Sequence, residues 1–181
     1  QLASKTFSTT AYYDSLISNW FQRNSNDTSE MFSTVGKLSS TLRYGENPHQ
    51  SASLYKSSLQ QSGIPYATLL QGKELSYNNI NDADAALQLI KEFDKEIPTV
   101  AIIKHANPCG VASGTSLCEA YTKALSCDTT SAFGGIIALN QIIDKDSAVE
   151  IIKIFTEVII APGITDEAKE IFESKSNLRI L

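Results

Sequence analysis

Residues 99–110 read TVAIIKHANPCG: an apolar, β-branched run leads into Lys104, His105 and a turn signal of Asn-Pro and Gly. The run lacks the alternation of a half-buried strand, so it predicts a strand over 99–104 that is covered on both faces. In α/β enzymes, chemistry is commonly placed where a buried strand enters a loop with ionisable side chains. Lys104 and His105 are therefore candidates for proton transfer and for stabilising an oxyanion. The alternative is a hydrogen-bonded loop histidine beside a solvated lysine.

Around this strand the sequence alternates between apolar runs and amphipathic stretches. Further strands are predicted at 135–139, 158–161 and 178–181, and helices at 82–93, 116–125, 147–156 and 166–174. Ser116 and Glu119 form a capping-box pattern, and Thr165 is the expected N-cap of the last helix. The alternation predicts an α/β fold, a three-layer α/β/α arrangement around a mostly parallel sheet.

The N-terminal part has a different character. Residues 11–23 carry one amphipathic helical stripe, and residues 24–33 are rich in Ser, Asn and Asp, which favour a loop or linker. The chain ends on an apolar run with no helix or polar tail after it, which favours a fragment of a longer protein.

Composition excludes several classes of protein. The 181 residues suffice for one large domain, or for one domain with an appendage, and the hydrophobic content of 42% is enough for a core. The formal net charge of −5 argues against a sequence-independent nucleic-acid binder. No apolar run reaches the length of a membrane span, and the N-terminus lacks a secretory apolar core, so we expect a cytoplasmic protein without membrane contact. Cys109, Cys118 and Cys127 form no Cys-x-x-Cys pair and are expected to be reduced thiols.

Four segments, taken together and in order, are far more specific than any one of them. They are LRYGENPHQ at 42–50, GKELSYNN at 72–79, KHANPCG at 104–110 and SAFGG at 131–135. In that order they closely resemble the bifunctional purine-biosynthesis family that joins AICAR transformylase to IMP cyclohydrolase. The resemblance implies formyl transfer from 10-formyltetrahydrofolate to the amine of AICAR, an aminoimidazole carboxamide ribonucleotide, and a cytidine-deaminase-like fold.

The resemblance also implies how the chain is divided. Residues 1–33 resemble the end of the cyclohydrolase domain and a linker, and residues 34–181 resemble the first half of the transformylase domain. Cyclisation to IMP is therefore expected of the complete protein, which by resemblance is a homodimer. Because the family's site is completed by the second half of the domain and between two protomers, residues 1–181 alone are expected to be inactive.

By the same resemblance, His105 is the base and Lys104 the electrostatic stabiliser. The AICAR amine is a poor nucleophile, so a base must take its proton and the tetrahedral alkoxide needs a positive partner. Neighbouring side chains on an extended segment point in opposite directions, so the chain must bend for both to reach one centre. Asn107-Pro108 and Gly110 are expected to provide that bend.

The resemblance further implies a set of substrate-binding residues. Arg43 would clamp the phosphate and Tyr44 would pack beside the sugar or base; a surface ion pair and a core tyrosine are the alternatives. His49 is expected to orient their loop rather than to react. Asn79 lies near the start of the predicted 82–93 helix, where it would meet a polar ligand or simply cap the helix.

Gly134 and Glu157 complete that set. Gly134 would let the nucleotide approach the backbone, with a bulge glycine as the alternative. Glu157 stands where some relatives carry Asp to hold the ribose hydroxyls. The neighbouring Ser131 and Ala132 are expected to serve packing.

Two other functions are compatible with parts of the sequence. Pro108-Cys109 resembles the ligand turn of zinc nucleoside deaminases, but Ala112 stands where the second Cys is needed and no His-x-Glu is present, so no zinc is expected. A non-catalytic nucleotide-binding or dimerisation module is the other alternative, favoured only by the apparent truncation.

Overall fold

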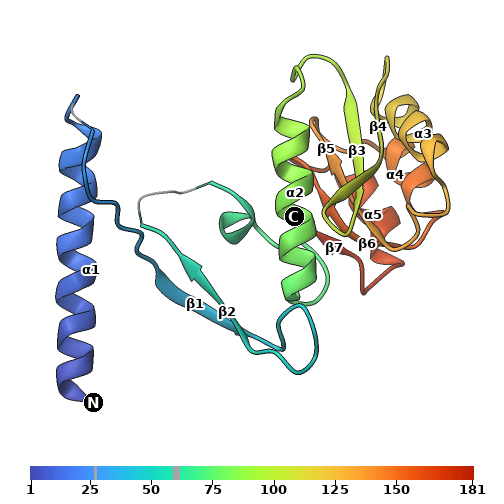
Figure 1. Ribbon diagram of the computed structural model, residues 1–181. Helices are drawn as coiled ribbons and strands as arrows, with labels where there is room; N and C mark the ends of the chain where they lie inside the picture. The colour runs from blue at the N-terminus through green and yellow to red at the C-terminus, as the bar shows by residue number, and fades with distance from the viewer. Residues whose placement is uncertain (27, 59–61) are drawn as a thin grey trace.

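A computed structural model describes residues 1–26, 28–58 and 62–181. It contains a long N-terminal helix, a two-stranded sheet and an α/β body (Figure 1). The elements are α1 (Leu2–Arg23), β1 (Lys37–Leu42), β2 (Ala52–Lys56), the 3-10 helix η1 (Ile64–Tyr66), α2 (Tyr77–Lys91), β3 (Thr99–Lys104), β4 (Asn107–Ser113), α3 (Leu117–Cys127), β5 (Gly135–Leu139), α4 (Lys145–Ile151), β6 (Thr156–Ile160), α5 (Asp166–Glu173) and β7 (Arg179–Ile180).

The body is built on a five-stranded sheet in the order β4-β3-β5-β6-β7. The predicted α/β class is confirmed. The sheet is mixed, however: β3 pairs antiparallel with β4 and β5, whereas β5, β6 and β7 are parallel, where mostly parallel pairing was expected. The difference has one cause. A tight hairpin turns the chain back from β3 into β4, so the α3 crossover delivers β5 antiparallel to β3.

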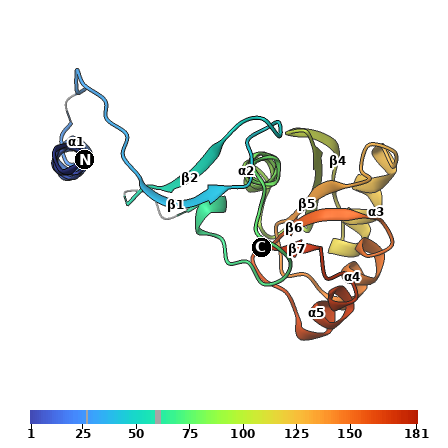
Figure 2. The same cartoon turned by 90° about the horizontal axis from the view of Figure 1, so that it is seen from below.

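Helices cover both faces of this sheet, as the three-layer prediction requires (Figure 2). Helix α2 packs on one face, where Ala83, Ala86 and Ile90 meet Ala101, Ile103 and the inward residues of β5 and β6. Helices α3, α4 and α5 pack on the other face in a larger cluster. The further prediction of a cytidine-deaminase-like fold stays a prediction.

Four helices begin at a side-chain cap that fixes their position. Ser76, Ser116, Asp144 and Thr165 each accept a hydrogen bond from a backbone N–H in the first turn, which satisfies one of the orphan donors there. Thr165 caps α5 as predicted. Helix α2 begins at Tyr77, five residues before the prediction, because Ser76 is the cap. Helix α4 begins after Asp144 and ends at Ile151, so the predicted 147–156 helix was placed too late.

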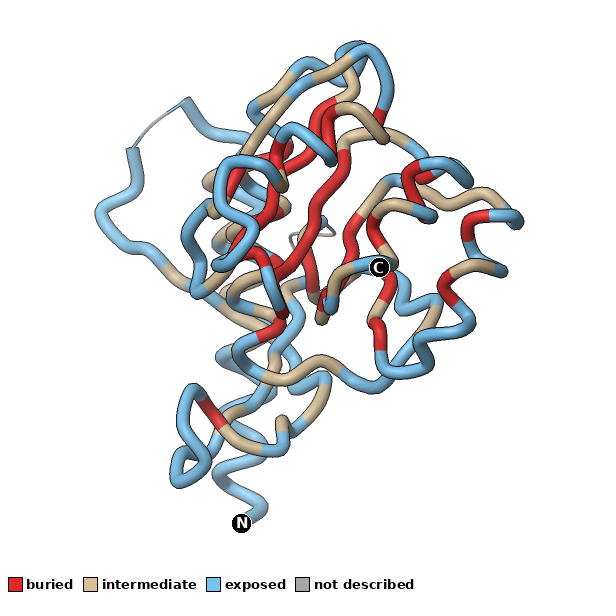
Figure 3. Tube along the Cα trace, turned by 90° about the vertical axis from the view of Figure 1, so that its right-hand side faces the viewer, coloured by how far each residue is buried: buried red, intermediate tan, exposed pale blue. Residues whose placement is uncertain are grey.

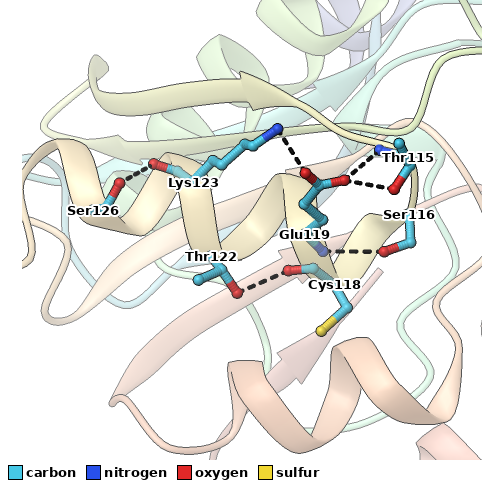
Figure 4. A network of polar contacts seen from close by, with 7 residues as sticks. All are labelled: Thr115, Ser116, Cys118, Glu119, Thr122, Lys123 and Ser126. Atoms are coloured by element: carbon cyan, nitrogen blue, oxygen red, sulfur yellow. Dashed lines mark hydrogen bonds and ion pairs between the residues drawn. The ribbon is translucent and has the colours of Figure 1, made fainter.

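The capping box predicted at α3 is only half present (Figure 4). Ser116 Oγ accepts from the Glu119 backbone N–H at 3.2 Å, as expected. The Glu119 carboxylate instead accepts from the backbone N–H and the hydroxyl of Thr115, at 2.7 and 2.6 Å, and lies 2.8 Å from Lys123 Nζ. Lys123 and, second, Thr115 lower the pKa of Glu119 to about 2.

This network predicts a pH-dependent contribution to stability. A carboxyl whose pKa is lower in the folded state stabilises the fold above its unfolded pKa, here about 4.5, and this stabilisation is lost as pH falls towards about 2. We expect Glu119→Gln to lower the melting temperature at neutral pH, with the difference from the unsubstituted protein shrinking between those two values. Melting curves across that range check this, and a constant difference at every pH would contradict it.

The N-terminal part is far less buried than the body. Within residues 2–23, which form α1, no residue is buried, and Phe7, Trp20 and Phe21 are among the exposed apolar side chains. The buried residues gather in the α/β body instead (Figure 3). Asn19 Nδ2 donates to Ser33, and Tyr12 hydrogen-bonds Ser58, so a few polar contacts tie α1 to the following segment. None of the helices in the described ranges has the length and apolarity to cross a membrane.

Candidate active site

Lys104 and His105 lie at a two-residue hairpin between β3 and β4. Lys104 pairs with Asn107, and the two residues between them, His105 and Ala106, have left-handed φ values of 51° and 58°. Asn107 and Pro108 belong to β4, so the expectation that they and Gly110 provide the bend is wrong. Left-handed backbone disfavours residues with a Cβ by roughly 1–2 kcal/mol each, so this turn is held against its local preference.

Two side chains hold this turn. The Asp82 carboxylate, from α2, accepts the backbone N–H of His105 at 3.2 Å and that of Ala106 at 2.9 Å. Asn107 Nδ2 donates to the His105 carbonyl at 2.7 Å. Asp82 was not among the predicted site residues, because its contact depends on how α2 packs against β3.

The Lys104 side chain reaches the start of β5. Its Nζ donates to the carbonyl of Gly134 at 2.9 Å and to that of Phe133 at 3.2 Å. Gly134 has a left-handed φ of 70°, and a Cβ there would lie 3.0 Å from Lys104 Nζ. The left-handed backbone favours glycine at this position, and a Cβ there would push the lysine end aside by a few tenths of an ångström.

Two phenylalanine side chains lie beside Lys104 and Gly134. Phe133 and Phe155 are both more than half exposed, at 62% and 53%, and their ring centroids are 5.4 Å apart. The Gly134 N–H donates to the Phe155 carbonyl at 2.7 Å, which holds the pair beside Lys104. The sequence motif pointed to Phe133 only as a neighbour of Gly134, and nothing in it pointed to Phe155. The packing prediction holds for Ala132, which is buried; Ser131 is exposed and donates its N–H to Asp128.

Asn79 and Glu157 come together from α2 and β6. Asn79 is only 4% exposed; its Oδ1 accepts from the Ser76 N–H at 3.2 Å, and its Nδ2 donates to Glu157 Oε2 at 2.7 Å. Asn79 therefore belongs to the capping box of α2, with Ser76 rather than Asn79 as the N-cap. Its amide also fixes the direction of the Glu157 carboxylate, so two predicted site residues form one unit.

Arg43 and Tyr44 follow β1 and pack on each other, with the guanidinium carbon 5.1 Å from the Tyr44 ring centroid. Arg43 lines a pocket of about 390 Å³ together with Lys73, Ser76 and Arg179 among others. In the described part of the chain, no hydrogen bond or ion pair joins Arg43 or Tyr44 to the hairpin.

The loop after Tyr44 connects this pocket to α2. Gln50 shapes the loop by accepting from the N–H groups of Gly45 and Asn47, each at 2.8 Å. Asn78 Nδ2 donates to the Glu46 carbonyl at 3.3 Å, which ties the loop to the first turn of α2. His49 is exposed in this loop.

All these groups lie at one end of the sheet. Because β3 is antiparallel to β5, its carboxyl end meets the amino end of β5. Glu157 near the start of β6 and Arg179 at the start of β7 lie at this same end of the sheet. Ligands of parallel α/β sheets usually bind at the carboxyl ends of the strands. Here the antiparallel β3 brings ionisable groups to the opposite end of the sheet, where the parallel strands β5, β6 and β7 begin, next to the first turn of α2.

Neither the Cys109 thiol nor a cluster of acidic groups forms a second candidate site in the described ranges. The three thiols are free, and burial raises the pKa of Cys109, with nearby Asp128 adding to the shift. A thiol with a raised pKa is a weak nucleophile. Across the described residues, no group of three or more His, Cys, Asp or Glu side chains is arranged to hold a metal ion.

Comparison with known proteins gives a consistent result. The family model described as AICARFT/IMPCHase bienzyme matches residues 1–181. The bifunctional purine biosynthesis proteins PurH of Brucella anthropi and Rhizobium johnstonii are each 57% identical to the chain, and that of Rhizobium etli is 58% identical. Each alignment covers 100% of this chain and 34% of the relative, so the chain spans about a third of their length. The chain therefore belongs to the AICARFT/IMPCHase bienzyme family.

Proposed function

We propose that this chain carries the proton-transfer and nucleotide-binding part of a site that transfers a formyl group from 10-formyltetrahydrofolate to the amine of AICAR. One observation carries the proposal: Lys104 and His105 lie on a constrained hairpin whose lysine reaches Gly134, at the same end of the sheet as Glu157 near the start of β6. The family to which the chain belongs and the names of its relatives support the same reaction.

In the proposed reaction, the AICAR amine attacks the formyl carbon while His105 takes a proton from that amine. The formyl carbonyl becomes a tetrahedral alkoxide, which Lys104 stabilises. Collapse re-forms the carbonyl and breaks the bond to the folate nitrogen, which takes the proton from the His105 imidazolium and leaves as tetrahydrofolate. Lys104 uses two donors on the carbonyls of Phe133 and Gly134, which leaves the third N–H of its ammonium for the alkoxide.

The nucleotide would lie along the end of the sheet at which β5, β6 and β7 begin. Arg43 would bind the phosphate in the pocket that Lys73 and Arg179 also line, with Tyr44 beside the sugar or base. The Glu157 carboxylate would accept from the ribose hydroxyls, and Asn79 would act mainly by orienting it. Gly134, which has no side chain, would let the ligand approach the backbone.

The domain division, the oligomeric state and the second activity belong to the complete protein. We place the end of the cyclohydrolase domain and the linker at 1–33 and the first half of the transformylase domain at 34–181, in keeping with the unburied α1. The complete protein would be a cytoplasmic homodimer that also cyclises the product to IMP. Since residues 1–181 match about a third of each relative, the rest would supply the folate pocket, and these residues alone would be inactive.

A kinetic experiment on the complete protein tests the proposal. We expect Glu157→Gln to raise the KM for AICAR about tenfold, with kcat changed less than about threefold, because a charge-assisted hydrogen bond to the ribose is lost. Glu96→Gln, in the exposed turn before β3, is the matched control and should leave both constants unchanged. Absence of formyl transfer by the complete protein would overturn the proposed function. An unchanged KM in Glu157→Gln would remove Glu157 from the site.

A further inference from the structure

The two-residue turn that carries His105 lacks the residue types that its left-handed backbone favours. Hairpins with two left-handed residues favour Asn-Gly or Asp-Gly, because glycine adopts that backbone freely and Asn or Asp tolerates it. Here the two positions are His105 and Ala106. Sparsely populated backbone persists only where the surroundings impose it, and such sites are often functional.

Among the described side chains, Asp82 holds the backbone N–H groups of both turn residues. Successive N–H groups in left-handed backbone form a small concave site for an anion. The Asp82 carboxylate fills it, with Oδ2 on the His105 N–H and Oδ1 on the Ala106 N–H. The remaining side-chain bond at the turn, from Asn107 Nδ2, holds the His105 carbonyl and leaves these two amides untouched.

The support for Asp82 is rigid. Helix α2 buries Ala83, Ala86 and Ile90 against the sheet face that includes Ala101 and Ile103 of β3. The carboxylate is therefore fixed relative to the strand that leads into the turn. Asp84, two residues further along α2, is exposed and offers a matched comparison.

We propose that Asp82 is a positioning residue for formyl transfer: it imposes the left-handed turn and so directs the Lys104 and His105 side chains to the reaction centre. The inference rests on the proposed function, because it assigns Asp82 a role in placing the groups that carry out that chemistry. Asp82 acts through the backbone and needs no contact with either substrate.

The test compares Asp82→Asn with Asp84→Asn in the complete protein. A side-chain amide offers one acceptor where the carboxylate offers two, so one turn amide loses its partner. We expect kcat to fall about ten- to a hundredfold, because small displacements of catalytic groups are costly, while the KM for AICAR changes less than about threefold. Amide hydrogen exchange at 105–106 should accelerate in Asp82→Asn and stay unchanged in Asp84→Asn.

A second substitution separates positioning from general damage. Ala106 is exposed, and glycine there adopts left-handed backbone without strain. Ala106→Gly alone should leave kcat unchanged, but in the Asp82→Asn background it should recover at least about fivefold. Should Asp82→Asn fail to fold, Asp82→Glu, which keeps the charge but displaces the carboxylate, serves the same comparison.

Normal kcat in Asp82→Asn, or a loss that Ala106→Gly leaves untouched, would overturn the positioning role. Either result leaves the proposed function standing if His105→Ala is inactive. Full activity of His105→Ala would instead overturn the proposed chemistry, whatever the Asp82 variants do.

Discussion

Replacing His105 with alanine in the complete protein should lower kcat for formyl transfer by about a hundredfold or more, because the proposed base that takes the proton from the attacking amine is lost. The affinity for AICAR should change little, since the proposed nucleotide contacts come from Arg43, Tyr44 and Glu157. Steady-state kinetics together with equilibrium binding of AICAR checks both parts.

The chain offers a close control for this experiment. It contains two histidines, and His49 is exposed in the loop after Tyr44. His49→Ala should retain most of the turnover. Near-normal kcat in His105→Ala, or an equal loss in both variants, would remove His105 from the proposed role as base.

Replacing Lys104 should have the second large effect on kcat. We expect Lys104→Met to lower kcat about a hundred- to a thousandfold, the range typical for loss of a group that stabilises an oxyanion. Lys104→Arg should fail to restore it. Lys104 Nζ donates to the carbonyls of Phe133 and Gly134, and a planar guanidinium would place its charge and its donors differently from this compact ammonium.

Lys153→Arg is the matched control, because Lys153 is exposed in the turn after α4 and pairs with Glu150 near the end of that helix. It should leave kcat unchanged. If Lys104→Arg turned over as fast as the unsubstituted protein, positive charge in general would suffice and the specific role of the ammonium would be wrong.

The fold was predictable wherever one local signal dominated. The strands at 99–104 and 135–139 match β3 and β5, because uninterrupted apolar runs bury well on both faces. Thr165 caps α5 as predicted. In contrast, β1 and β2 went unpredicted, because short, largely polar strands in a separate two-stranded sheet have no buried face to mark them. The hairpin into β4 was missed because His-Ala is not a turn signal.

The candidate site was predictable as a set of residues but not as an arrangement. The pairing of Asn79 with Glu157 joins positions 78 residues apart, and Lys104 meets Gly134 across 30 residues. Such contacts depend on strand order and helix packing, which local pattern does not contain. Asp82 was missed for the same reason: in the sequence it is one more polar residue on an amphipathic helix.

The most direct test of the central claim is a crystal structure of the complete protein with AICAR bound. We expect the AICAR amine within hydrogen-bond distance of the His105 imidazole, the ribose hydroxyls on Glu157 and the phosphate at Arg43, with Asp82 still holding the His105–Ala106 turn. A nucleotide bound away from the β3–β4 hairpin, or an amine facing groups other than His105 and Lys104, would contradict the account.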